Sequence, residues 1–232
     1  MPRTTSLRGR RAGALAGAVC VATTMSAVAS GAAQTTAPAP GAAATARPAS
    51  ADLERIRLRT NVLAGRRASV RGVVRPALAG QRVVAQRRAG DGWRTLARAT
   101  TRPGGRFTLR WRTSRPRSVQ LRVRVLRSER ARPARRVVGR LNVYRRAQAS
   151  WYGPGLYGNA LGCGGRLSPG TLGVAHKTLP CGSKVTLRHQ GRTVRVRVID
   201  RGPYVGNREY DLTAATKARL GFGSTGAVLV TR

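Results

Sequence analysis

The sequence predicts an all-β protein in which a β-sandwich is followed by a small closed barrel. Short runs of alternating apolar and polar residues recur from about residue 52, and glycine, proline or aspartate separates one run from the next. From residue 149 onward the composition changes toward glycine, tyrosine and proline, which marks the start of a second domain. Only one segment, residues 213–220, has the pattern of a helix.

The first domain is expected to span residues 52–146. Phe107, Leu109 and Trp111 alternate with arginines, so one face of this strand is apolar and the other is charged. The run 90–93 (GDGW) predicts a hairpin turn. Antiparallel strands at this spacing predict a β-sandwich, which resembles the Ig-like modules of bacterial wall proteins. The expected strands are residues 69–74, 81–86, 93–99, 106–112 and 119–126. We expect the carboxylates of this part to be solvated partners of neighbouring arginines: Asp52, Glu54, Asp91 and Glu129.

The second domain is expected to span residues 149–232. Its expected strands are residues 149–152, 173–175, 184–188, 192–199 and 227–231, and its helix is capped by Asp211 and ends at Gly221. In so short a segment, closure into a barrel removes the exposed strand edges.

The N-terminus has the features of an export signal. Four arginines in the first 11 residues precede a weakly apolar stretch, and small residues at 27–29 and 31–33 offer cleavage sites. A signal peptide over residues 1–33 is therefore expected instead of a stable membrane span, with Sec and Tat export both open. Residues 34–51 are rich in alanine, proline and threonine, which predicts a disordered spacer.

The net charge is +38, and nearly all of it comes from arginine. Such a chain attracts polyanions. Export and a low aromatic content of 4% argue against nucleic acid as the partner, because stacking platforms need aromatic side chains. The expected anionic partners are wall polymers and membrane lipids, although GC-rich codon usage also explains much of the arginine. No cofactor is indicated.

Cys163 and Cys181 remain after signal cleavage, and in an oxidising compartment such a pair most simply forms a disulfide. A loop of this length would stabilise the fold by about 3 kcal/mol on the chain-entropy model. Two cysteines with a distant histidine lack zinc-ligand spacing, so no metal is expected. A cysteine nucleophile paired with His176 or His189 fits export poorly.

The run 194–203 (VRVRVIDRGP) places Asp200 at the end of an apolar strand face, where the glycine and proline stop the strand. A partly desolvated carboxyl holds its proton more readily, as a general acid must. The more ordinary alternative is that Asp200 accepts backbone N–H bonds at the following turn. On this run alone both readings stay open.

Four segments together resemble the rare lipoprotein A (RlpA-like) double-psi β-barrel family, which is related to the barrels of barwin and expansins. The segments are 149–153 (ASWYG), 175–185 (AHKTLPCGSKV), 194–203 and 210–213 (YDLT). The resemblance covers residues 149–232 and implies a six-stranded double-psi β-barrel with a short helix.

Members of that family studied as enzymes are lytic transglycosylases, which cleave the β-1,4 bond between N-acetylmuramic acid and N-acetylglucosamine and leave a 1,6-anhydro end. The resemblance implies Asp200 as the catalytic residue, acting first as acid and then as base, on peptidoglycan glycan strands. It implies substrate-binding roles for His176, Tyr152 and Arg201, and Glu209, on another loop, is a further candidate in place of the family's usual glutamate. Gly202 and Pro203 would shape the turn, and His176 has the alternative of a structural histidine at a strand end.

One departure from the family pattern matters. Active relatives carry a glutamate in a segment that corresponds here to 163–166 (CGGR), and Gly165 stands in its place. Two functions therefore compete: a transglycosylase acting through Asp200, and a non-catalytic, expansin-like wall-binding or wall-loosening module. A third hypothesis is an extracellular polyanion binder that uses the arginine-rich sandwich.

Overall fold

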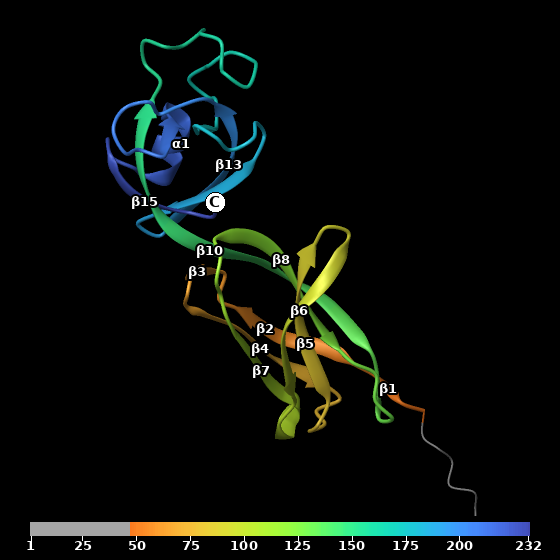
Figure 1. Cartoon of the computed structure of the whole chain (residues 1–232). Helices are drawn as coiled ribbons and strands as arrows, with labels where there is room; N and C mark the ends of the chain where they lie inside the picture. The colour runs from red at the N-terminus through yellow and green to blue at the C-terminus, as the bar shows by residue number, and fades with distance from the viewer. Residues whose placement is uncertain (1–46) are drawn as a thin grey trace, which may run out of the picture. The chain divides into compact units, whose positions relative to one another are not determined.

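The computed structural model describes residues 47–232 (Figure 1). The expected signal peptide and residues 34–46 of the expected spacer lie outside this range. The end of the spacer is not disordered as predicted, because β1 (Ala49–Ser50) pairs in parallel with β9 (Ala131–Arg132) and so gains backbone partners. Within residues 47–232, no helix has the length and apolar character needed to cross a membrane.

Two sheets share one apolar core in the first part of the chain. Val70 and Leu109 from one sheet and Leu121 and Val123 from the other are fully buried in the same cluster. The all-β class is therefore confirmed, whereas the Ig-like assignment stays a prediction. The first sheet contains β2 (Asp52–Leu58), β4 (Arg67–Arg75) and β7 (Arg106–Arg112). The second contains β6 (Gly92–Thr100), β5 (Arg82–Ala89), β8 (Arg117–Val125) and β10 (Ala134–Tyr152), with β3 (Asn61–Leu63) beside β10.

The expected strands of this part correspond to β4, β5, β6, β7 and β8 to within a few residues. Residues of β7 alternate between exposed and buried, as a half-buried strand requires, whereas four successive residues of β5 are buried. The hairpin at residues 90–93 is also confirmed, since Ala89 pairs with Gly92. A single 3-10 turn, η1 (Pro103–Gly105), precedes β7.

Six strands close into a barrel in the second part. The order is β14-β11-β13-β12-β15-β10, and β10 pairs back onto β14, so no edge is left open. The contacts of β14 with β10 and of β11 with β13 are parallel, and the other four are antiparallel. The strands are β11 (Val174–Ala175), β12 (Lys184–His189), β13 (Arg192–Asp200), β14 (Tyr210–Thr213) and β15 (Gly226–Val230), together with the end of β10.

Strand β10 belongs to both sheet systems, as Figure 1 shows. Its first part pairs with β8, and from Arg145 onward it pairs with β15. The domain boundary expected at residues 147–148 thus falls inside one continuous strand. The stretch 140–152 contains neither glycine nor proline, so nothing in it interrupts the extended backbone.

The helix α1 (Ala214–Leu220) is confirmed, but its predicted N-terminal cap is wrong. Thr213 is the N-cap, and its side chain accepts a hydrogen bond from the backbone N–H of Thr216. Asp211 lies too early, because β14 keeps the chain extended through Thr213. Gly221 ends the helix in the left-handed conformation, as predicted.

Candidate functional site

Asp200 is the last residue of β13, and a β-bulge sets its position. Val198 lies opposite Val174 of β11, but Asp200 lies opposite Ala175, so two residues of β13 advance where β11 advances one. The alternation predicted for this strand is confirmed, since Val196 and Val198 are buried and the arginine between them is exposed. Asp200 itself is half-buried. Bulges commonly re-aim a side chain beside an active site.

One oxygen of the Asp200 carboxylate is held by the backbone. Oδ1 accepts hydrogen bonds from the N–H of Gly162, at 2.7 Å, and from the N–H of Arg201, at 2.8 Å. No group among residues 47–232 donates a hydrogen bond to Oδ2. Oδ1 therefore accepts the backbone hydrogen bonds expected for an aspartate at a turn, and Oδ2 is available for proton transfer.

Gly162 is a site residue that the sequence did not reveal. A Cβ at this position would lie 2.9 Å from Arg201 Cγ and 3.0 Å from Asp200 Oδ1, closer than real Cβ atoms normally come. Only glycine lets the backbone N–H approach the carboxylate this closely. The close contact joins residues 38 positions apart, so no local pattern could have found it.

Tyr152 lies beside Asp200. Its hydroxyl oxygen is buried and has no hydrogen-bond partner among the described residues. Burial raises the pKa of Tyr152, and the negative charge of Asp200 raises it further. The phenol therefore keeps its proton at neutral pH and can donate a hydrogen bond.

A second carboxylate, Asp211, stands on the other side of Ala175. Ala175 of β11 pairs with Asp200 on one neighbouring strand and with Asp211 on the other. Ser150 Oγ donates a hydrogen bond to Asp211 Oδ1 at 2.6 Å. Burial raises the pKa of Asp211, and the Ser150 hydrogen bond partly opposes this shift. In place of the predicted helix cap, Asp211 is thus a half-buried neighbour of the candidate acid.

His176 is held in a defined orientation. Its Nδ1 accepts hydrogen bonds from the backbone N–H groups of Thr178, at 3.1 Å, and Leu179, at 3.0 Å. Its ring meets that of the buried Tyr210 edge-on, with centroids 4.8 Å apart. Burial lowers the pKa of His176. Because Nδ1 accepts these bonds, the neutral ring carries its hydrogen on Nε2. The bonds to Nδ1 fit the alternative that His176 is a structural histidine at a strand end.

The guanidinium of Arg201 ties together the loop after β11. It donates to the carbonyl oxygens of His176, at 3.1 Å, and Leu179, at 2.7 Å, and lies 3.0 Å from Cys181 Sγ. Gly202 follows with a φ of +121°, a conformation that residues with side chains rarely adopt. Pro203 is buried in the same turn.

Glu209 is occupied by an ion pair. Its two carboxylate oxygens accept hydrogen bonds from Arg145 at 2.9 and 2.6 Å. This bidentate contact raises the pKa of Arg145. Glu209 acts on His176 through its charge, but its carboxylate is already paired.

The predicted disulfide between Cys163 and Cys181 is confirmed. It joins the segment that contains Gly162 to the loop after β11, and the N–H of Cys163 also donates to the carbonyl of Ile199 at 3.2 Å. Gly165 lies in the same segment with a φ of +82° and open space where a side chain would project. A Cβ there would meet no other atom, but any side chain would strain the backbone at this φ.

Comparison with known proteins gives a consistent result for this part of the chain. The family model described as "Lytic transglycolase" matches residues 145–231. A "Probable endolytic peptidoglycan transglycosylase RlpA" of Synechocystis sp. is 40% identical over 107 residues, covering 41% of this chain and 33% of the relative. The "Endolytic peptidoglycan transglycosylase RlpA" of Campylobacter jejuni is 42% identical over 84 residues, covering 35% and 30%.

Among solved structures, the Streptomyces papain inhibitor (SPI) matches 38% of this chain with a TM-score of 0.30 and 23% identity. The chain spans about a third of the length of the curated relatives it matches. The family model and the curated relatives confirm the resemblance for the barrel: residues 145–231 form an RlpA-like double-psi β-barrel domain.

Proposed function

We propose that the barrel domain cleaves the glycan strands of peptidoglycan as a lytic transglycosylase, with Asp200 as its acid and base. The observation that carries this proposal is the asymmetry of the Asp200 carboxylate. Two backbone N–H groups fix Oδ1, and Oδ2 has no partner among the described residues. A carboxyl fixed through one oxygen presents the other in a defined direction, as proton transfer requires. The names of the matched relatives support peptidoglycan as the substrate.

In the proposed reaction the protonated Asp200 donates its proton to the bridging oxygen of the β-1,4 bond, and the bond to C1 of the muramyl sugar breaks. The resulting carboxylate then takes the proton of the C6 hydroxyl, whose oxygen bonds to C1. The products are a shortened strand with a new hydroxyl and a 1,6-anhydro end. No water is consumed, so a single carboxyl completes the cycle.

The neighbouring side chains would orient the sugar. Tyr152 keeps its proton and lies beside Asp200, and because its hydroxyl is buried it would donate a hydrogen bond to the free carboxylate oxygen and so help to position the acid. His176 would donate through Nε2, because Nδ1 is already used as an acceptor. Arg201 and Glu209 would act mainly by shaping the site, since the side chains of both form hydrogen bonds with other protein groups.

Mass spectrometry of digested peptidoglycan tests the activity. We expect anhydro-muramyl ends from the parent protein and none from Asp200→Asn, which keeps the size of the side chain and loses its acid chemistry. Asp91→Asn is the matched control, because this carboxylate is fully exposed in the β5–β6 turn. Equal product from the parent and from Asp200→Asn would rule out Asp200 as the acid.

A second candidate function is a non-catalytic module that binds or loosens the wall. The observation that favours it is Gly165, which stands where active relatives carry a glutamate. This candidate predicts that the parent gives no products from intact or peptide-stripped glycan. It also predicts that the parent and Asp200→Asn still sediment equally with insoluble peptidoglycan.

We further propose that the protein is exported to the cell envelope and retained there partly by charge. The net charge of +38 supports attraction to anionic wall polymers. Retention by charge weakens steeply as the salt concentration rises. It can therefore be measured as the fraction of the protein that increasing salt releases from isolated cell walls.

A further inference from the structure

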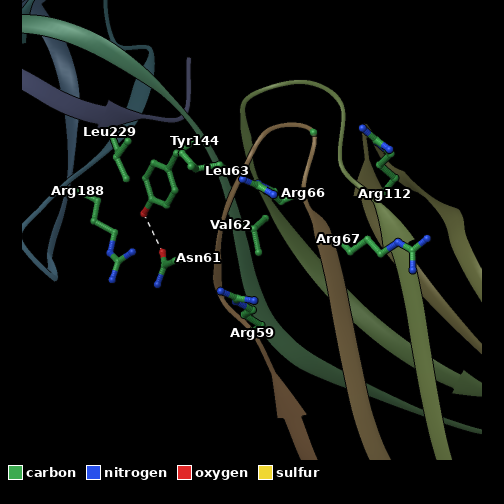
Figure 2. A pocket seen from close by; sticks show the side chains of 11 residues that line it. Arg59, Asn61, Val62, Leu63, Arg66, Arg67, Arg112, Tyr144, Arg188 and Leu229 are labelled. Atoms are coloured by element: carbon green, nitrogen blue, oxygen red, sulfur yellow. Dashed lines mark hydrogen bonds between the residues drawn. The ribbon is translucent and has the colours of Figure 1, made fainter.

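A cavity of about 750 Å³ lies next to β10, away from Asp200 and its neighbours. Figure 2 shows that its lining comes from the β3–β4 region, from the end of β7, from β10 and from two barrel residues. Five of its eleven lining residues are arginines, and none is acidic. The arginines are Arg59, Arg66, Arg67, Arg112 and Arg188.

These five guanidiniums are not neutralised by the protein. Within residues 47–232 none of them forms a salt bridge, and none donates a side-chain hydrogen bond. Among the described residues, none is a hydrogen-bond partner of the buried Nε of Arg188. Unpaired guanidiniums that line one cavity leave their N–H donors available to an anion that enters it.

The strand register brings two of these arginines together. Arg67 of β4 and Arg112 of β7 are direct cross-strand partners. Like charges directly opposite each other destabilise a sheet. A negatively charged group between the two would turn this repulsion into attraction.

The part of the lining on β3 and β10 is ordered. Tyr144 is buried, and its hydroxyl donates to Asn61 Oδ1 at 2.8 Å, the contact drawn in Figure 2. Asn142 Nδ2 donates to the same oxygen at 3.2 Å. These bonds fix β3 against β10, so the arginines that follow β3 extend from a rigid base.

We propose that this cavity binds a linear, phosphate-rich anion through several of its arginines. The guanidinium is planar and pairs with phosphate oxygens in a bidentate manner, which makes arginine suited to phosphate recognition. The volume lies in the range of pockets that hold whole ligands, so it accommodates several linked phosphates. This discrete site goes beyond the diffuse retention by charge proposed above and does not depend on glycan cleavage.

The test uses the full chain and inorganic tripolyphosphate, with binding measured by isothermal titration calorimetry. The pocket variant carries Arg59→Gln, Arg67→Gln and Arg112→Gln. The control variant carries Arg94→Gln, Arg98→Gln and Arg106→Gln, which remove the same charge from exposed strand positions outside the cavity. We expect one site per chain in the parent, affinity lower by about tenfold or more in the pocket variant, and little change in the control.

Three results would overturn the proposal. Equal weakening in both variants would mean that only net charge matters. Many weak sites in the parent would also mean that only net charge matters. Citrate that binds as tightly as tripolyphosphate would refute selectivity for phosphate. Circular dichroism of both variants checks that the fold is kept. An abasic deoxyribose-phosphate oligomer, compared with tripolyphosphate, then distinguishes a phosphodiester ligand from a free polyphosphate.

Discussion

Removal of the disulfide tests how far the Cys163–Cys181 loop stabilises the barrel. The perturbation is the double variant Cys163→Ser and Cys181→Ser. The two cysteines are separated by 18 residues, and the enclosed loop carries few regular elements of its own. Without the covalent link, the unfolded chain regains the freedom of that loop, while the folded state keeps most of its contacts.

The loop length sets the expected magnitude. On the chain-entropy model, a loop of this size lowers the free energy of unfolding by about 3 kcal/mol when it is opened. For a protein of this size each 1 kcal/mol moves the midpoint by about 2–4 °C, so the melting temperature should fall by roughly 6–12 °C.

Differential scanning calorimetry, with and without a phosphine reductant, measures the effect. The reductant should lower the melting temperature of the parent and leave that of the double variant unchanged. If the parent and the double variant unfold within about one degree of each other, the loop does not contribute as the entropy model requires.

Two further predictions concern the site. Gly162→Ala should lower glycan cleavage by about tenfold or more, because the new Cβ would displace the Asp200 carboxylate from its 2.7 Å hydrogen bond. Gly170→Ala is the control, since a Cβ there meets nothing within 4 Å, and equal activity in the two variants would contradict the argument. The lowered pKa of His176 means that the folded state favours the neutral ring, so the parent should lose stability as pH falls below about 6.5. Urea unfolding at several pH values measures this loss, which His176→Gln should reduce; an identical pH dependence in both proteins would refute it.

Much of the secondary structure could be read from local pattern. Period-2 alternation depends only on neighbouring residues, and it predicted β4, β6, β7 and β8 as well as β13 and its terminal aspartate, whereas β2 and the first part of β10 were not predicted. The helix end at Gly221 was predictable for the same reason, because a left-handed cap is a property of the glycine itself. The cap at the other end was misassigned to Asp211, since the pairing of β14 with β10 extends the strand through Thr213.

The sequence by itself determined the all-β class, the pairing of Cys163 with Cys181, and the position of Asp200 at a strand end. What only the tertiary structure decided are contacts between distant segments. Gly162 reaches Asp200 across 38 residues, and Ser150 reaches Asp211 across 61. The arginine-lined cavity likewise gathers residues as far apart as Arg59 and Arg188. Such contacts follow from the closure of the barrel and the pairing of β3 with β10, and no periodicity within a single strand encodes them.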